Sequence, residues 1–279
     1  MKNFPIPVLS PGPGSQPEKD QLDYIQMPAG MITFQAPVLP EPEEVSDLLA
    51  ARELLMQAYH ALSNYREGDR PVCLDLSALD KENIRLLNQL LGEGEVSASV
   101  QADAHRIRIQ ESVFAGLWRV GFLDSSDRMI ADQLEIGPVP AAIYDAGSNG
   151  ATRLELKADD VSGVTNAPAI LSEIAEHMLK PGHAHVINLS LMPFTPEDGL
   201  YVDKALGRGK VTLLSRGYGN CRITLTAMSR VWWVQFFNST DVPILNTIEI
   251  TDIPEVALAA IEDIRDSAAR LLDVIKWIS

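Results

Sequence analysis

The residues with the clearest chemical potential are a cysteine and two histidines in the second half of the chain. Cys221 follows a glycine-rich turn at 216–220, where a nearby guanidinium could lower the pKa of the thiol and make it reactive. His183 and His185 have a spacing that places both rings on one side of a strand, where they could chelate a metal. The alternatives are an inert, buried Cys221 and histidines in a surface loop. We favour these because no second pair of ligands lies nearby in the sequence.

No motif in the sequence indicates an enzyme. The Gly-x-Gly runs at 92–94 and 207–209 follow predicted helices, so no helix N-terminus points at an anion, and no Lys-Ser or Lys-Thr comes after them. The sequence holds no Gly-x-Ser-x-Gly run and no paired-carboxylate motif. We therefore predict a protein that is not an enzyme and that carries no metal and no cofactor.

Two adjacent tryptophans are candidates for an apolar contact. Trp232 and Trp233 lie on a predicted strand, so their side chains point to opposite faces of a sheet. One ring must lie in the core. The other is either covered by the long C-terminal helix or exposed beside Phe236 or Phe237, where it would mark a binding face. Of these two interpretations we favour the one in which both rings are core.

The candidate residues lie in a unit that occurs twice. A shift of 114 positions carries Trp118 onto Trp232, and the same shift carries 135–140 onto 249–254 with Glu, Ile and Pro retained. A shift of 115 carries 91–96 onto 206–211. One inserted residue accounts for the difference between the shifts of 114 and 115. Because hydrophobic and turn positions both keep this register, the sequence predicts an internal duplication.

Each predicted unit begins with a helix, at 46–64 with Ser46 as its N-cap and at 168–179. A buried strand follows, at 72–76 or 186–191, and then a second helix that starts after Asp80 or Thr195 and ends in Leu-Gly. Four short-looped strands complete the unit. The predicted fold class is α+β: two tandem repeats of a helix-strand-helix plus four-stranded, mostly antiparallel meander unit, with a long C-terminal helix at 256–277.

The chain divides into three predicted regions. Residues 1–30 form a flexible, Pro-rich arm, because Pro and Gly disfavour ordered elements there. Residues 31–150 form the first unit, which opens on a short strand at 31–35, and residues 151–279 form the second unit with its C-terminal helix. We place the boundary in the loop at 147–150, since the first unit has only 141–144 where the second has its long helix.

The charge of the chain limits its partners. Acidic residues number 38 and basic residues 23, a formal net charge of −15, which excludes nucleic acid as a partner because phosphate binding needs clustered Lys and Arg. The charge permits a basic partner such as an Arg-rich peptide, and an acid excess alone also keeps a protein soluble.

Export and membrane signals are missing from the sequence. The start of the chain is Pro-rich and lacks a basic and then apolar stretch, and no apolar run nears the roughly 18 residues of a membrane span. Two cysteines, Cys73 and Cys221, are too few for a disulfide framework, and we expect a buried Cys73 in its strand. The sequence predicts a cytoplasmic protein with no membrane span.

Long segments of the chain resemble the hydrogenase expression/formation proteins of the HupH/HyaF type. The resemblance is carried by 90–97, 217–224, 232–239, 245–249 and 253–260, and by the N-terminal stretch from Met31 to Glu43. One departure is Ile261, where relatives tend to carry Pro before Glu-Asp; it affects only the start of the last helix.

This resemblance implies an accessory chaperone in the maturation of an uptake nickel–iron hydrogenase. Its partners would be the iron–sulfur small-subunit precursor before export through the twin-arginine pathway, including the signal peptide of that precursor, and other maturation factors. The alternative is a thiol- or metal-handling redox factor of hydrogenase assembly that uses Cys221 with His183 and His185.

We place partner binding on the second unit because it differs from the first there and because aromatic side chains anchor interfaces. The predicted partner-binding residues are Arg216, Gly217, Tyr218, Gly219, Asn220, Cys221, Trp232, Trp233 and Phe236.

Overall fold

The structure is a computed structural model that describes residues 40–278 apart from 103, 156–162, 181 and 218. The predicted arm at 1–30 and the predicted strand at 31–35 lie outside this part of the chain. Within it, no helix combines the length and the apolar character that crossing a membrane requires.

The described chain contains six α-helices, ten strands and three short 3-10 helices. The α-helices are α1 Leu49–Asn64, α2 Lys81–Leu91, α3 Ala141–Ser148, α4 Ala167–Met178, α5 Pro196–Leu206 and α6 Ile261–Trp277. The strands are β1 Val72–Asp75, β2 Val96–Gln101, β3 Arg106–Glu111, β4 Leu117–Leu123, β5 Met129–Ile136, β6 His185–Asn188, β7 Arg208–Ser215, β8 Asn220–Thr226, β9 Val231–Phe237 and β10 Pro243–Ile250. The 3-10 helices are η1 Pro42–Glu44, η2 Leu189–Leu191 and η3 Glu255–Ala257.

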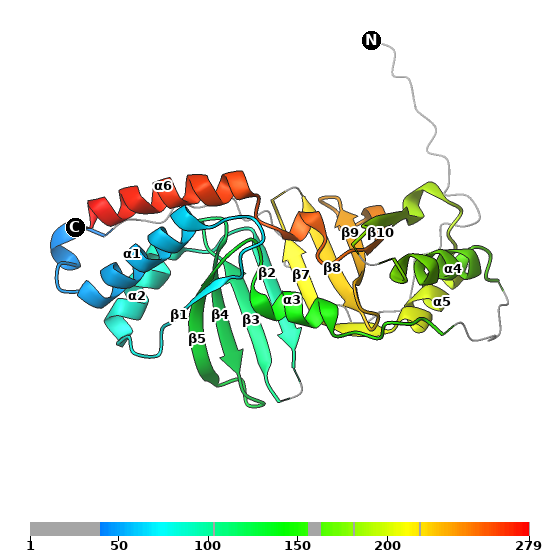
Figure 1. Cartoon of the computed structure of the whole chain (residues 1–279), viewed down its shortest axis with the longest axis horizontal. Coiled ribbons are helices and arrows are strands. Elements are labelled where there is room, and N and C mark those ends of the chain that lie inside the picture. Colours follow the sequence, from blue (N-terminus) through cyan, green and yellow to red (C-terminus); the bar gives the residue numbers. More distant parts are fainter. Residues whose placement is uncertain (1–39, 103, 156–162, 181, 218, 279) are drawn as a thin grey trace, which may run out of the picture. The chain divides into compact units, whose positions relative to one another are not determined.

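All ten strands form one sheet in the order β1-β5-β4-β3-β2-β7-β8-β9-β10-β6, and every neighbouring pair is antiparallel (Figure 1). The α+β class, the antiparallel meanders and the C-terminal helix are confirmed. Sequence reasoning did not predict that the two meanders join edge to edge. Strand β2 pairs with β7 in a register centred on Ala98 and Leu213.

Several residues separated by 114 positions have the same structural environment in the two halves of the chain, 31–150 and 151–279. Trp118 and Trp232 are both fully buried, and each indole Nε1 donates to a backbone carbonyl 19 residues later, that of Gly137 at 2.8 Å and that of Thr251 at 3.1 Å. The β4–β5 and β9–β10 turns each contain an Asp at positive φ, with φ of 59° at Asp127 and 58° at Asp241. A non-glycine residue in this region is uncommon, so the shared conformation reflects a shared turn geometry.

Buried hydrophobic side chains form three clusters on the two faces of the sheet. The central cluster contains Trp118 and Trp232 and is covered by α3 and η3. Side chains alternate along a strand, so their neighbours Leu117 and Val231 point to the other face. Leu117 joins a cluster with α1, α2 and α6, and Val231 joins a cluster with α4 and α5.

The C-terminal helix differs from its prediction in extent and in position. It begins at Ile261 and not at 256, because η3 and an extended stretch come first, and the Ala259 N–H donates to the carbonyl of Pro138 at 2.9 Å. Helix α6 packs on α1 in the first half of the chain (Figure 1). It therefore does not cover Trp232 or Trp233.

Helix α3 runs through Gly147 and Ser148, where the sequence predicted a loop. A Cβ on Gly147 would lie 3.0 Å from the Trp232 ring and 3.2 Å from the Asp252 carbonyl, so glycine permits this close approach between the two halves. The predicted N-cap at Ser46 is also wrong: α1 begins at Leu49, and its N-cap, Leu48, makes no side-chain capping bond. The predicted caps Asp80 and Thr195 are confirmed.

Strand β1 is not the buried strand that the sequence predicted. It is an edge strand that pairs only with β5, and Val72 is 42% exposed. The prediction of a buried Cys73 is wrong for the same reason, because its side chain is exposed at this edge. In strand β6, at the other edge, Ile187 is buried and Val186 is exposed.

Asp198 joins the N-termini of two helices. One carboxylate oxygen accepts from the backbone N–H groups of Thr165, Asn166 and Ala167 at 2.8–2.9 Å, and the other accepts from the N–H and hydroxyl of Thr195 at 3.1 Å. Burial alone would raise the pKa of Asp198, but these bonds outweigh it and lower the pKa from 3.8 to about 2. The ionised carboxylate therefore stabilises the start of both α4 and α5.

Replacing this carboxylate by its amide tests that role. We expect Asp198→Asn to reduce the free energy of unfolding by roughly 2–3 kcal/mol, because the amide nitrogen cannot accept hydrogen bonds. The pKa of Asp198 is lower in the folded protein than in the unfolded chain. Asp198 therefore contributes its full free energy of stabilisation above about pH 4, and this contribution is lost as the pH falls toward 2. Urea unfolding at pH 7 and pH 3 measures both effects. Glu197→Gln, at an exposed neighbour, is the control, and equal losses in the two variants would contradict the assignment.

Candidate functional site

A broad groove of ≈ 1810 Å³ lies over the central cluster. The loop 65–71 and the start of α3 line one part of it, and the chain from Glu249 to Ile264, which includes η3 and the start of α6, lines another. Trp118 and Phe236 contribute from the sheet beneath. Pockets for small molecules usually measure about 300–1,000 Å³, so this groove has the size for a polypeptide segment.

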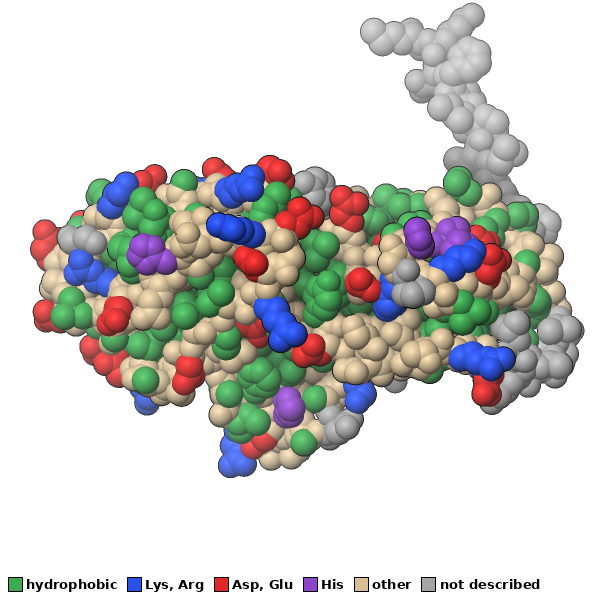
Figure 2. Space-filling view, in the orientation of Figure 1, with side chains coloured by type: hydrophobic (Ala, Val, Ile, Leu, Met, Phe, Trp, Pro, Cys, Tyr) green, Lys and Arg blue, Asp and Glu red, His purple; other side chains and the backbone are tan. Residues whose placement is uncertain are grey.

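The lining of the groove combines apolar side chains with carboxylates. Near the middle of the face in Figure 2, hydrophobic side chains lie exposed between acidic ones, next to η3 and the start of α6. Ten acidic residues contribute to the lining: Glu67, Asp69, Glu95, Glu111, Asp145, Glu249, Asp252, Glu255, Glu262 and Asp263. Arg70 is the one Lys or Arg among the lining residues. The groove therefore favours a ligand that is both cationic and apolar.

Two of these carboxyl groups are withdrawn from solvent, since Glu111 is buried and Glu249 is half-buried. Burial raises the pKa of Glu111 to about 7, and the charges of Glu95 and Asp263 add to the increase. Burial also raises the pKa of Glu249, with a further contribution from Glu255. A guanidinium or ammonium group in the groove would reverse both shifts, since an opposite charge nearby favours the ionised form.

The place of Glu249 follows from a difference between the halves. Its counterpart Glu135 is buried and accepts a hydrogen bond from the Ala141 N–H at 2.8 Å, which satisfies the first turn of α3. The equivalent chain after Glu249 forms only the short η3 before α6 departs to the first half. Glu249 therefore lines the groove, where its carboxylate accepts a hydrogen bond from the Thr247 hydroxyl at 3.3 Å.

The structure brings two of the predicted partner-binding residues to the groove, Gly217 and Phe236. Gly217 lies against Glu95, because a Cβ there would come 2.1 Å from the carboxylate. Arg216 and Gly219 are exposed, and Asn220 is half-buried at the start of β8. Tyr218 lies outside the described residues.

The other three predicted residues lie beside or below the groove. Trp232 and Cys221 are buried in the central cluster, with exposed fractions of 0% and 1%. Trp233 is half-buried on the opposite face, where it packs against the third cluster and its indole donates to Asn246. Between the two tryptophans, Trp233 is thus the more accessible.

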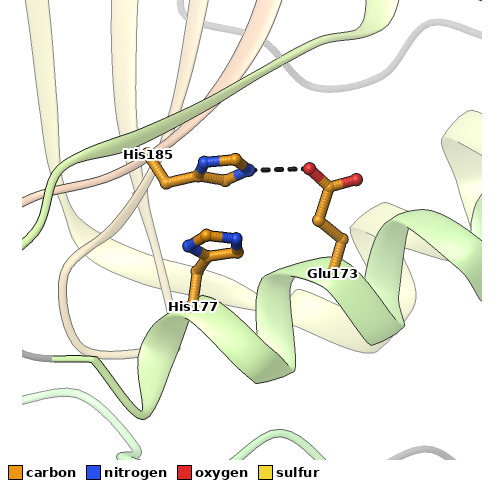
Figure 3. A group of neighbouring side chains, drawn as sticks. All are labelled: Glu173, His177 and His185. Carbon is orange, nitrogen blue, oxygen red and sulfur yellow. Dashed lines mark hydrogen bonds and ion pairs between the residues drawn. The ribbon is translucent and has the colours of Figure 1, made fainter.

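The favoured interpretation of Cys221 as a buried, inert thiol is confirmed, and His183 and His185 do not form the suggested pair. Burial raises the pKa of Cys221 to about 12, so its thiol is protonated at neutral pH and the thiol-based alternative function loses its reactive group. His185 does not pair with His183; it lies against His177 and Glu173 of α4 (Figure 3). The Gly-x-Gly runs follow α2 and α5, as predicted, and act as helix ends.

Sequence reasoning missed the acidic lining. Its members come from at least six separate segments, between Glu67 and Asp263, and only the fold brings them together. The high net charge was the one signal in the sequence, and it did not locate them.

The fold and the groove define an α+β protein with one ten-stranded antiparallel sheet and a large acidic, apolar cleft. The sequence profile described as the HupH hydrogenase expression protein, C-terminal conserved region, matches residues 48–155 and 164–278. The chain therefore belongs to the HupH family of hydrogenase expression/formation proteins.

Relatives in several bacteria match over nearly the whole chain. It is 48% identical to the hydrogenase expression/formation protein HoxQ of Cupriavidus necator, over 100% of this chain and 99% of the relative. It is 44% identical to HupH of Rhodobacter capsulatus, over 100% and 99%. It is 32% identical to the hydrogenase-1 operon protein HyaF of Escherichia coli, over 96% and 95%. The predicted family is confirmed.

The two cysteines should differ in accessibility. Cys73 is exposed, so we expect it to react with a thiol reagent in the folded protein. The reaction should be slower than that of free cysteine, because partial desolvation of the thiol and the charges of Glu135 and Asp75 raise its pKa. Cys221 should react only after unfolding. Thiol counts before and after denaturation measure this, with Cys73→Ser as the control. Rapid modification of Cys221 in the folded chain would contradict the structure.

Proposed function

We propose that this protein is a cytoplasmic chaperone in hydrogenase maturation that binds the iron–sulfur small-subunit precursor before export. In this proposal the protein performs no catalysis itself and also meets other maturation factors. Its relatives are named hydrogenase expression/formation proteins, which supports the hydrogenase part of the proposal. The observation that carries the binding part is the large groove with ten carboxylates over an apolar floor.

The chemistry of an export signal suits this groove. A secretory signal has a positively charged n-region followed by about 7–15 apolar residues, and the twin-arginine type carries two adjacent guanidinium groups. The apolar stretch would contact Phe236 and Val256, and the guanidinium groups would face Glu249 and Glu255. Each guanidinium can make two parallel hydrogen bonds to one carboxylate, which adds orientation to the charge attraction.

We also infer that the two halves, 31–150 and 151–279, are copies of one unit. The strand order supports this, since it is the same from either edge when β1–β5 are matched with β6–β10. The register at the centre supports it too. Val96 pairs with Ser215 and Val100 with Val211, so the pairing is symmetric about Ala98 and Leu213 under the shift of 115. The groove arises where these copies meet.

Removing charge from the groove tests the proposed binding site. The triple variant Glu255→Gln, Glu262→Gln, Asp263→Asn alters three exposed carboxylates around the start of α6. We expect it to weaken binding of the precursor signal peptide by about 10- to 30-fold at low salt, since each exposed ion pair contributes up to about 1 kcal/mol. Calorimetric titration of the peptide measures the affinity, which should also fall as salt rises.

A second triple variant controls for net charge. Glu44→Gln, Glu53→Gln, Glu197→Gln also neutralises three exposed carboxylates, and none of them lines the groove. We expect its affinity to stay within about threefold of the parent protein, because distant exposed charges are screened. Equal losses in the two variants would refute the groove as the site. A precursor that binds equally well without its signal peptide would refute the proposed ligand.

A further inference from the structure

Three side chains with metal-binding atoms converge at one end of α4. Glu173 and His177 are four residues apart and share one helix face, and His185 begins the edge strand β6 beside it (Figure 3). Glu173 is exposed, and both histidines are half-buried. The His185 Nε2 lies 2.7 Å from a carboxylate oxygen of Glu173. The two imidazole rings are stacked, with centroids 3.5 Å apart and planes 4° from parallel.

The ring nitrogens are placed where a metal ion could bind them. A neutral imidazole nitrogen is the form that binds a metal ion. Figure 3 shows Glu173 to one side of both rings, so one nitrogen on each ring lies toward the carboxylate.

The backbone that carries these side chains is held in place by packing. Ile170 and Ile174 of α4 are buried in one cluster with Ile187 of β6, with exposed fractions of 3%, 0% and 3%. The helix and the strand therefore keep their separation, and only side-chain torsions need to change for the three donors to meet. One ligand atom from each residue already lies within 4.8 Å of the other two.

We propose that Glu173, His177 and His185 form a binding site for one divalent first-row transition-metal ion of the Zn²⁺ type. Two imidazole nitrogens and one carboxylate oxygen make a ligand set that Zn²⁺ accepts in tetrahedral sites, with the fourth position left to solvent. Bond lengths of about 2.0–2.2 Å require the donors to close in from their present spacing, which rotation of the half-buried rings provides. The bound ion fastens the edge strand β6 to α4.

This site is separate from the groove but shares a strand with it. Val186 follows His185 on β6, so its side chain points to the opposite face, where it lines the groove and is 55% exposed. Metal binding would therefore order the strand that borders the groove without occupying it.

Metal titration of the full-length protein tests the site. After removal of metal with a chelator, we expect one Zn²⁺ per chain to bind with a Kd of roughly micromolar or below, measured against a chromogenic competitor. Co²⁺ should give visible d–d absorption of a four- or five-coordinate ion. His177→Ala and His185→Ala should each weaken binding at least about tenfold. The exposed His60 of α1 supplies the matched control, and His60→Ala should bind as the parent does.

Metal-free melting temperatures of the variants separate lost binding from lost folding. His177 is not among the buried residues of α4, so we do not expect its substitution to unfold the helix. Zn²⁺ should raise the melting temperature of the parent protein and of His60→Ala but not of His177→Ala. Binding no tighter than about 100 µM, or binding that survives both histidine substitutions, would overturn the proposal. The cluster would then be a hydrogen-bonded contact only.

Discussion

The pairing of β2 with β7 is the interaction on which the rest of the structure depends. Five residue pairs, from Val96 with Ser215 to Val100 with Val211, join two meanders into one sheet. Without this ladder each half would end in an unpaired edge strand, which in a folded protein is a template for association with other chains. The ladder also brings the apolar faces around Trp118 and Trp232 together into one central cluster.

Two helices, each packed against the half of the chain to which it does not belong, reinforce that ladder. Helix α3 of the first half contacts Trp232 of the second at Gly147, and α6 of the second half packs on α1 of the first. Each of these contacts buries apolar surface that neither half could bury alone, which is worth roughly 25 cal/mol per Å². The path of the chain toward α6 carries Glu255, Glu262 and Asp263 across the central cluster, so the groove is a consequence of this crossing.

Local features of the sequence predicted the elements well, because propensity, capping and alternation act over a few residues. The caps at Asp80 and Thr195 and the four-strand meanders followed from such patterns. Burial of β1 was predicted from its apolar residues alone, but the exposure of Cys73 depends on which strand lies at the sheet edge. The groove carboxylates and the cluster at His177 are formed by residues from distant segments of the chain. The sequence alone does not show that these residues lie close together.

The carboxylates of the groove do not recur at matching positions of the two halves. Shifts of 114 and 115 carry Glu111 onto Leu225 and Glu95 onto Lys210, so neither groove carboxylate has an acidic counterpart in the second half. Glu249 has one, Glu135, but that carboxylate is used to start α3. The strand order is the same from either edge of the sheet, but the charges do not repeat in this way. Burial raises the pKa of Glu111, so its ionised form is disfavoured in the free protein, and a cation bound nearby would stabilise that form. Because the carboxylates are distributed unequally between the two halves, the groove would hold an extended ligand in one direction. A symmetric lining would not distinguish the two directions.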